Sequence, residues 1–137
     1  MFSTKIKTRF FDADPAGIIF YGNIFKYIHS AYEDFIAGLR LKRNYFLDKD
    51  FVLPILHAEA DYHLPIKYGE TLTINIEVTK LKRSSFELSY KIFNNKKVEV
   101  ATAKTVHVCV SKNTFKKIEM PDELFNKLNS HLQNLND

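Results

Sequence analysis

A chain of 137 residues is the size of one ordinary domain, and its 45% hydrophobic and 14% aromatic residues can form a substantial core. The charged fraction of 26% is normal for a folded protein, so disorder is not expected. The formal net charge of +4 is too small to indicate a nucleic-acid-binding protein, although it is compatible with a polyanionic ligand.

The first patterned segment runs from Phe2 to Phe11. Ile6 and Phe10 fall on one face of an extended chain, and lysine and arginine fall on the other, which predicts a strand. The next six residues, 12–17, read Asp-Ala-Asp-Pro-Ala-Gly and have the composition of a turn.

A helix is predicted from about Tyr21 to Leu39. Apolar side chains recur there at helical spacing, at Ile24, Tyr27, Ile28, Ala31, Phe35 and Leu39. We expect this helix to be mostly buried, and Gly38 suits its C-terminal end. Residues 40–52 mix charged and aromatic side chains and are expected to form a loop or a short helix.

The second half of the chain predicts successive strands. Their expected ranges are residues 54–62, 71–79, 86–93 and 98–111, with a hairpin turn at Asn94-Asn95. Pro121 opens a final short helix, because proline fits the first turn and the acids that follow it favour the positive end of a helix.

These elements predict an α+β domain over residues 1–137. Short connections between strands favour antiparallel pairing. An antiparallel sheet of about five strands wrapped around one long helix, followed by a short C-terminal helix, would bury the apolar residues. Such a sheet leaves exposed edges, so we expect a homo-oligomer, either a dimer or a tetramer built as a dimer of dimers.

The turn at residues 12–17 is the best candidate for chemistry. Asp12 and Asp14 precede the predicted helix start, where backbone N–H groups lack helical partners and carry the positive end of the helix dipole. These N–H groups can stabilise an oxyanion, and a carboxylate beside them can act as a nucleophile or general base on a carbonyl. The residues alone fit ordinary turn and capping roles as well. A calcium-binding EF-hand is excluded, because Ala16 and Asn23 stand where two of its ligands are needed.

The ten residues 14–23, Asp-Pro-Ala-Gly-Ile-Ile-Phe-Tyr-Gly-Asn, resemble the active-site segment of the 4-hydroxybenzoyl-CoA thioesterase family, which has the hotdog fold. The resemblance implies that Asp14 attacks a thioester carbonyl or activates water. It implies that the backbone N–H of Tyr21 holds the thioester oxygen, and that Gly17 lets the chain approach the substrate closely.

Four further segments resemble the branch of this family that hydrolyses 1,4-dihydroxy-2-naphthoyl-CoA: residues 29–33, 53–58, 65–70 and 106–110. The resemblance extends from about residue 4 to residue 123. It implies an acyl-CoA substrate, with an aromatic acyl group favoured over a short-chain one, and no cofactor apart from the coenzyme A of the substrate. The substrate-binding residues on this interpretation are Gly17, Ile18, Asn23, His29 and His57.

Two pairs of polar residues have alternative interpretations. His29 and Glu33 share a helix face, and His57 and Glu59 share a strand face. Either pair could line an acyl pocket or lie at an ordinary surface or subunit interface. No metal site is predicted, because the chain has no His-Glu-x-x-His pattern. The Tol-Pal-linked branch of the family has glutamate where His29 stands and histidine where Tyr21 stands, so only Asp14 is transferred as the catalytic carboxylate.

Lys82, Arg83 and Ser84 precede a phenylalanine in a stretch that resembles the place where family members hold the CoA phosphates. Lysine, arginine and hydroxyl groups are suitable phosphate donors. The alternative is a solvated hairpin end. Lys96-Lys97 and Lys116-Lys117 are interpreted as surface charge only.

The remaining features concern location and competing functions. Cys109 is the only cysteine and lies in an apolar run, which indicates a buried residue in a reducing compartment. The chain begins without a signal-peptide pattern and has no membrane-length apolar stretch, so we expect a cytoplasmic protein that is not inserted in a membrane.

The sequence predicts an acyl-CoA thioesterase. A non-catalytic module that binds acyl-CoA or acyl-carrier protein is the alternative, and a nucleic-acid-binding domain is a weaker one.

Overall fold

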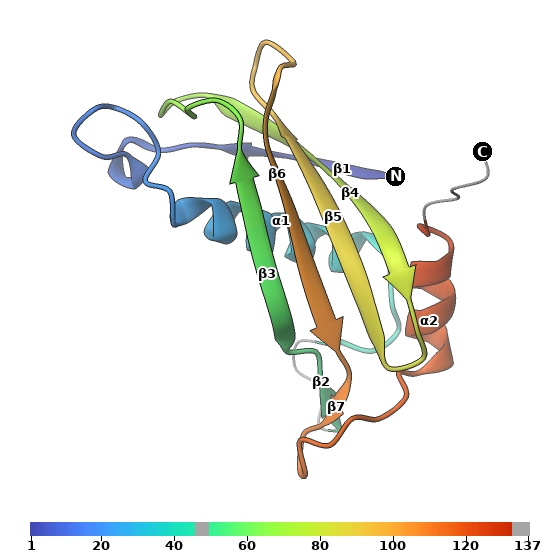
Figure 1. Ribbon diagram of the computed structural model, residues 1–137. Coiled ribbons are helices and arrows are strands. Elements are labelled where there is room, and N and C mark those ends of the chain that lie inside the picture. Colours follow the sequence, from blue (N-terminus) through green and yellow to red (C-terminus); the bar gives the residue numbers. More distant parts are fainter. Residues whose placement is uncertain (46–49, 133–137) are drawn as a thin grey trace.

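The computed structural model describes residues 1–45 and 50–132. Five strands form one antiparallel sheet in the order β1-β4-β5-β6-β3 (Figure 1). Their bounds are Phe2–Lys7 (β1), Ile55–Tyr62 (β3), Thr71–Leu81 (β4), Ser85–Phe93 (β5) and Glu99–Val108 (β6). The expected antiparallel five-stranded sheet is therefore confirmed.

Helix α1, Asn23–Gly38, lies across one face of this sheet (Figure 1). Its apolar stripe faces the sheet and includes Ile24, Ile28 and Ala31, each at most 2% exposed. Alternate side chains of β4 and β5 form the opposing layer, such as Ile76 and Leu88, both fully buried. Burying a side chain of this size contributes about 2 kcal/mol, so this layer stabilises the packing of α1 on the sheet.

The helix is shorter than the sequence indicated. It has 16 residues and lacks Tyr21 and Leu39, which belong to turns at its two ends. The left-handed residue after its C-terminus is Arg40, with φ 53°, whereas Gly38 is still helical. The sheet is thus covered by a helix of ordinary length, and the expected long helix is not confirmed.

The first strand is also shorter than expected. β1 ends at Lys7, where the chain turns into a 3-10 helix, η1, at Phe10–Asp12. Thr8 leaves the strand pattern because its N–H and its hydroxyl both bond to the carbonyl of Glu70. Phe10 is consequently 74% exposed and does not continue the inner face of the strand.

The long strand predicted at residues 98–111 is interrupted at Cys109. β6 ends at Val108, and a short strand β7, Val110–Ser111, pairs instead with β2, Phe51–Val52. Part of the predicted 40–52 loop, residues 46–49, lies outside the described residues. Cys109 is fully buried, as expected.

Helix α2, Asp122–Asn129, follows Pro121 as predicted. Leu124 and Leu128 are fully buried, and the helix packs beside β4. In the described ranges, no helix is long and apolar enough to cross a membrane.

Strand β3 forms one edge of the sheet and is exposed along almost all of its length. Ile55, Leu56 and Tyr62 are 42%, 69% and 45% exposed. An open edge with apolar side chains is a template for pairing with another strand.

Candidate active site

The Asp14 segment forms a small hairpin rather than a loose turn. Asp14 N–H donates to the carbonyl of Ile18 at 2.8 Å, and Gly17 N–H donates to the carbonyl of Asp14 at 3.0 Å. Ala13 and Ile19 face each other as an antiparallel bridge. Gly17 has φ +78°, a left-handed conformation that strains other residues, so the sequence needs glycine here to close the hairpin.

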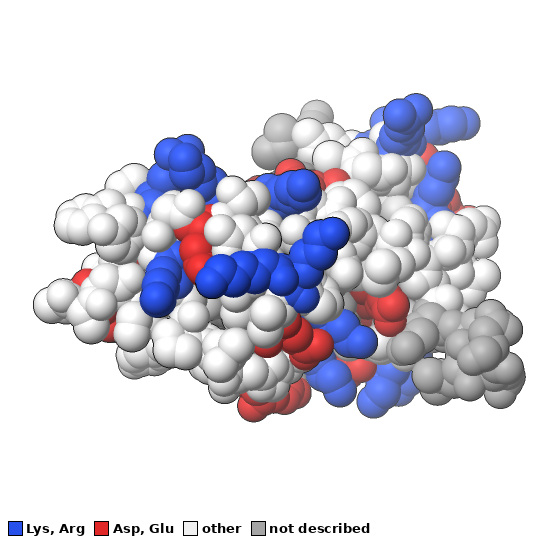
Figure 2. All heavy atoms as spheres, turned by 90° about the horizontal axis from the view of Figure 1, so that it is seen from above, with Lys and Arg blue, Asp and Glu red and all other residues white. Residues whose placement is uncertain are grey.

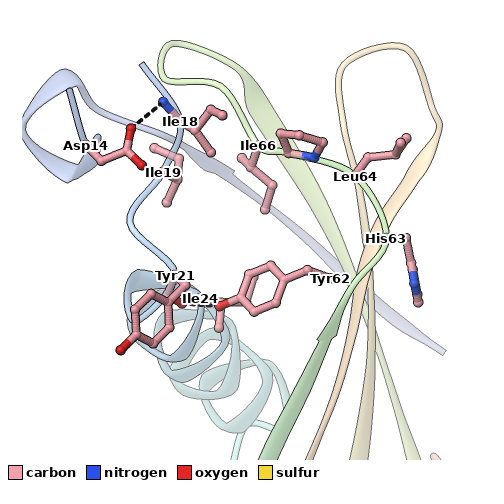
Figure 3. Close-up of a pocket in the computed structure, with 10 residues that line it drawn as sticks. Asp14, Ile18, Ile19, Tyr21, Ile24, Tyr62, His63, Leu64 and Ile66 are labelled. Carbon is pink, nitrogen blue, oxygen red and sulfur yellow. Dashed lines mark hydrogen bonds between the residues drawn. The ribbon is translucent and has the colours of Figure 1, made fainter. Parts of the chain in front are cut away.

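The hairpin holds one oxygen of the Asp14 carboxylate and leaves the other available. Oδ1 accepts the N–H of Ala16 at 2.8 Å and that of Ile18 at 3.3 Å. Oδ2 makes no hydrogen bond to any residue in the described part of the chain. The carboxylate therefore has a fixed orientation and one free oxygen (Figure 3).

A cavity of about 380 Å³ lies beside this carboxylate. Its lining is mainly apolar and comes from the Asp14 hairpin, the start of α1 and the end of β3 with the loop after it (Figure 3). The lining residues are Asp14, Ile18, Ile19, Tyr21, Ile24, Tyr62, His63, Leu64, Pro65 and Ile66. Among the predicted site residues, Asp14, Ile18 and Tyr21 are thus brought together.

Tyr21 lies in the turn immediately before α1. Its N–H donates to no acceptor among residues 1–45 and 50–132, so it is available to a ligand. The unpaired N–H groups at a helix start carry the positive end of the helix dipole. This arrangement can stabilise an oxygen on which negative charge develops.

The Tyr62 hydroxyl donates a hydrogen bond to the Tyr21 carbonyl and links the end of β3 to the turn before α1. Burial, followed by the charge of Tyr21, raises the pKa of Tyr62, so its hydroxyl stays protonated as a donor. This role of Tyr62 and the position of His63 in the lining are not predicted from the sequence. The sequence signal was weak, because both residues lie at the end of an unremarkable alternating strand.

Asn23 and Gly17 have structural contacts in the same segment. Asn23 Nδ2 donates to the carbonyl of Asp12 at 2.9 Å, which fastens the first turn of α1 to the hairpin. Gly17 accepts the N–H of Tyr68 at 3.4 Å. Both residues lie next to the cavity residues in the chain, although neither lines the cavity itself.

His29 lines a second, separate cavity of about 270 Å³ between α1 and the sheet. The lining is almost entirely apolar and includes Phe25, Ile28, Tyr32, Ile55, Ala58, Tyr90, Thr105 and His107. Within one chain, His29 and Asp14 therefore face different cavities. His57 lines neither cavity, and its Nε2 lies 3.0 Å from Glu59 Oε1. Because side chains alternate along a strand, His57 points to the face opposite Ala58.

Lys82, Arg83 and Ser84 lie at the β4–β5 hairpin, and Asp14 lies in the segment between β1 and α1. This hairpin and this segment are at opposite ends of the sheet (Figure 1). β4 has 11 residues, so its ends are about 33 Å apart. Arg83 Nη2 lies 2.8 Å from Asp122 Oδ1, and its guanidinium lies 4.5 Å from the ring of Phe125. The predicted phosphate-binding residues and Asp14 are thus not brought together within one chain.

The distribution of charge bears on other ligands. In the described residues, no three His, Cys, Asp or Glu side chains gather as metal ligands. Seen from above, lysine and arginine are dispersed over the visible face with acidic residues between them, and they form no continuous stripe (Figure 2). A nucleic-acid interface on this face has no support from this pattern.

Comparisons with known proteins agree with the fold. The profile of the thioesterase-like superfamily matches residues 8–128. The chain is 37% identical over 118 residues to a 1,4-dihydroxy-2-naphthoyl-CoA hydrolase of Synechococcus elongatus, covering 85% of this chain and 86% of that protein.

Two solved structures are similar over nearly the whole chain. A 1,4-dihydroxy-2-naphthoyl-CoA thioesterase from Synechocystis superposes with a TM-score of 0.85 at 27% identity, covering 93% of this chain and 94% of the other. A DHNA-CoA thioesterase from Staphylococcus aureus gives 0.82 at 27% identity, covering 94% and 86%. The chain belongs to the thioesterase-like superfamily and has its hotdog fold.

Proposed function

We propose that this protein is a thioester hydrolase that cleaves an acyl-CoA to the free acid and coenzyme A. The observation that carries the proposal is the oriented Asp14 carboxylate, with one free oxygen, beside an apolar cavity and a helix start. An aromatic acyl group such as 1,4-dihydroxy-2-naphthoyl is favoured, because relatives at 37% and 32% identity are named for that substrate. The 4-hydroxybenzoyl and short-chain acyl groups are the alternatives.

The reaction uses the two features at the lip of the cavity. The free Oδ2 of Asp14 attacks the thioester carbonyl carbon, or removes a proton from a water that does so. The carbonyl oxygen gains negative charge and lies against the free N–H of Tyr21. The C–S bond then breaks and the thiolate leaves with the electron pair. If Asp14 has attacked directly, water hydrolyses the resulting anhydride and restores the carboxylate.

The alternative function is a module that binds acyl-CoA or an acyl-carrier protein without hydrolysis. The two functions differ in whether a reactive group is needed beside the carbonyl. A carboxylate at the edge of an apolar cavity is unfavourable for simple binding of a neutral thioester, because it brings a charge to a desolvated site. Asp14 therefore supports the enzyme over the binding module.

The proposal includes a homo-oligomer in which β3 pairs with β3 of a second copy. Antiparallel pairing about a two-fold axis puts the Tyr62 end of one strand beside the Ile55 end of the other. The His29 cavity, which includes Ile55, then faces the Asp14 cavity of the other copy. Joining two such dimers would give a tetramer.

The same pairing bears on the coenzyme A site. It brings the β4–β5 hairpin of one copy to the end of the joined sheet that holds Asp14 of the other. Lys82, Arg83 and Ser84 could then hold phosphates of a substrate whose thioester lies at the partner's carboxylate. We also propose a cytoplasmic location. The buried Cys109 is a free thiol, which is compatible with a reducing compartment.

The test is hydrolysis of a panel of aromatic and short-chain CoA thioesters by the wild type and by Asp14→Asn. Thiol release is followed with a chromogenic disulfide, and binding is measured separately by calorimetry. We expect the variant to bind with similar affinity and to lose at least about a hundredfold in kcat. Full activity of Asp14→Asn would refute the assignment, and binding without turnover by the wild type would establish the binding module instead.

A further inference from the structure

We propose that Asp12 is a positioning residue, whose buried carboxylate fastens the Asp14 hairpin to helix α1 and so sets where the catalytic carboxylate points. This inference rests on the proposed function, because it assumes that Asp14 is the reacting group. The sequence alone predicts only a turn or capping role for Asp12. The contacts of Asp12 in the structure extend beyond such a role.

The side chain of Asp12 is enclosed by the first two turns of α1. Only 5% of Asp12 is exposed. Its Oδ2 accepts the hydroxyl of Tyr27 at 2.7 Å, and its Oδ1 accepts the ammonium of Lys26. A residue that merely ends a turn would not need two donors on the neighbouring helix.

The backbone of Asp12 adds three further connections. Its carbonyl accepts the N–H of Phe20 and the Nδ2 of Asn23, both at 2.9 Å. Its N–H donates to the carbonyl of Arg9 at 3.0 Å. Asp12 is therefore the point where η1, the closing arm of the hairpin and the first turn of α1 meet.

The hairpin has few other ways to fix its direction relative to α1. The bonds of Asp14 to Ala16, Gly17 and Ile18 are internal to the hairpin and would survive a rigid swing of the whole unit. On the other side, Ile19 N–H bonds to the carbonyl of Ile66 at 2.7 Å, and two neighbouring contacts join Gly17 to Tyr68 and Ile18 to Lys67. Anchors on opposite sides define an orientation, and Asp12 provides the one on the helix.

The protonation states agree with this geometry. Burial acts to raise the pKa of Asp12, but the hydrogen bonds from Lys26 and Tyr27 and the Lys26 charge outweigh it and lower the pKa. Burial and the Asp12 carboxylate raise the pKa of Tyr27 above its usual value. Asp12 is therefore ionised and Tyr27 is a donor at neutral pH.

Asp12 and Asp14 are separated by one residue, so a change at Asp12 affects the position of the Asp14 carboxylate. Releasing the helix-side anchor lets Oδ2 of Asp14 leave its position relative to the Tyr21 N–H. Misplacement of a reacting group by about 1 Å costs roughly a hundredfold in rate. Asp12 lines neither of the two cavities, so substrate binding should change little.

The experiment compares Asp12→Asn and Tyr27→Phe with a control on the same helix, Asp34→Asn. Asp34 accepts the Thr4 hydroxyl at 2.8 Å but lies at the other end of α1. For both test variants we expect kcat to fall about ten- to a hundredfold, with KM within about twofold of wild type. Hydrogen exchange of residues 13–20 should accelerate in the test variants and remain at the wild-type rate in the control.

Tyr27→Phe retains the Asp12–Lys26 ion pair, so it keeps the test valid if Asp12→Asn fails to fold. Unchanged kcat and unchanged exchange of residues 13–20 in a folded test variant would overturn the positioning role while leaving the proposed function intact. An equal fall in kcat in the control would also overturn it, because the effect would then be general destabilisation. Full activity of Asp14→Asn would refute the proposed function and, with it, a role of Asp12 in catalysis. Faster exchange of residues 13–20 in the Asp12 and Tyr27 variants would then show only that Asp12 is a structural anchor.

Discussion

The imidazole of His107 lies parallel to the ring of Phe86, with centroids 4.7 Å apart and an angle of 6° between the planes. Tyr32 stacks on its other face at 4.5 Å, and Nε2 lies 2.8 Å from the hydroxyl oxygen of Thr105. His107 has no exposed surface. Burial, with a smaller effect of His29, lowers the pKa of His107 to about 4, so the ring is neutral in the folded protein at pH 7.

This burial predicts a loss of stability in mild acid. The unfolded chain takes up the His107 proton near pH 6.5, whereas the folded protein resists it until about pH 4. The unfolded state therefore binds more protons in that window, and the free energy of unfolding falls as the pH is lowered. The expected contribution is up to about 3 kcal/mol, measured by urea unfolding at several pH values.

The matched control is His63→Gln, since His63 is exposed. This variant should keep the wild-type slope of stability against pH between 6.5 and 4. His107→Gln should be less stable at pH 7, because it loses two stacking contacts, and should show a shallower slope. A wild-type slope in His107→Gln would contradict the account.

Gly17→Ala should reduce both stability and activity. Alanine at φ +78° costs about 1–2 kcal/mol, and relief of that strain would open the hairpin that orients Asp14. Gly69→Ala is the matched control, because Gly69 has φ +83° and open space around it, and it lies outside both cavity linings. Both variants should lose similar stability in urea unfolding, but only Gly17→Ala should lose kcat at a temperature where both are folded.

The sequence allowed the prediction of most elements, because local periodicity reports directly on helices and on half-buried strands. It failed where tertiary contacts decide the outcome. Phe10 alternates with Ile6 as a strand would, yet bonds between Thr8 and Glu70 turn the chain away. The break at Cys109 has the same origin, since the chain beyond it pairs with β2 and no longer with β5.

The candidate site was predictable in part. The Asp14 segment could be identified because its hairpin and helix start are local in sequence. Tyr62 could not, because its hydrogen bond to Tyr21 joins residues 41 positions apart. The role of Asp12 was also hidden, since a turn aspartate and a buried anchor have the same sequence pattern until Tyr27 is placed beside it.

Tyr62→Phe tests the link between β3 and the turn before α1. The variant keeps the ring in the cavity lining and removes only the donor to the Tyr21 carbonyl. We expect a loss of about 1 kcal/mol in stability and a several-fold fall in kcat, because the Tyr21 N–H is held less firmly. Tyr68→Phe is the control, since Tyr68 is 47% exposed and contacts Phe10 through its ring. Equal kcat values for the two variants would exclude this role of Tyr62.

Pairing through β3 predicts that Ala58→Glu produces monomers. Ala58 lies in the middle of the edge strand, where two-fold pairing would bring the two introduced charges close together in a desolvated interface. Ser3→Glu puts the same charge on β1, the opposite edge of the sheet, and should leave the assembly intact. Sedimentation velocity distinguishes the two. A monomeric wild type, or an unchanged assembly in Ala58→Glu, would refute pairing through this edge.

The role of the β4–β5 hairpin can be tested by changing the substrate as well as the protein. Lys82→Gln and Arg83→Gln should each raise KM for a CoA thioester several-fold and leave kcat unchanged, because phosphate contacts far from the thioester contribute uniform binding. The corresponding pantetheine thioester lacks the nucleotide phosphates, so its KM should not change.

The two substrates must be compared because Arg83 has structural contacts of its own. Arg83 also binds Asp122 and stacks on Phe125, so its replacement could loosen α2 without involving any phosphate. Loosening of α2 would affect both substrates equally and would appear as a lower urea midpoint. Lys82 is exposed, so Lys82→Gln should keep the wild-type stability. Equal KM changes for the CoA and pantetheine thioesters in both variants would show that the β4–β5 hairpin does not bind the nucleotide phosphates.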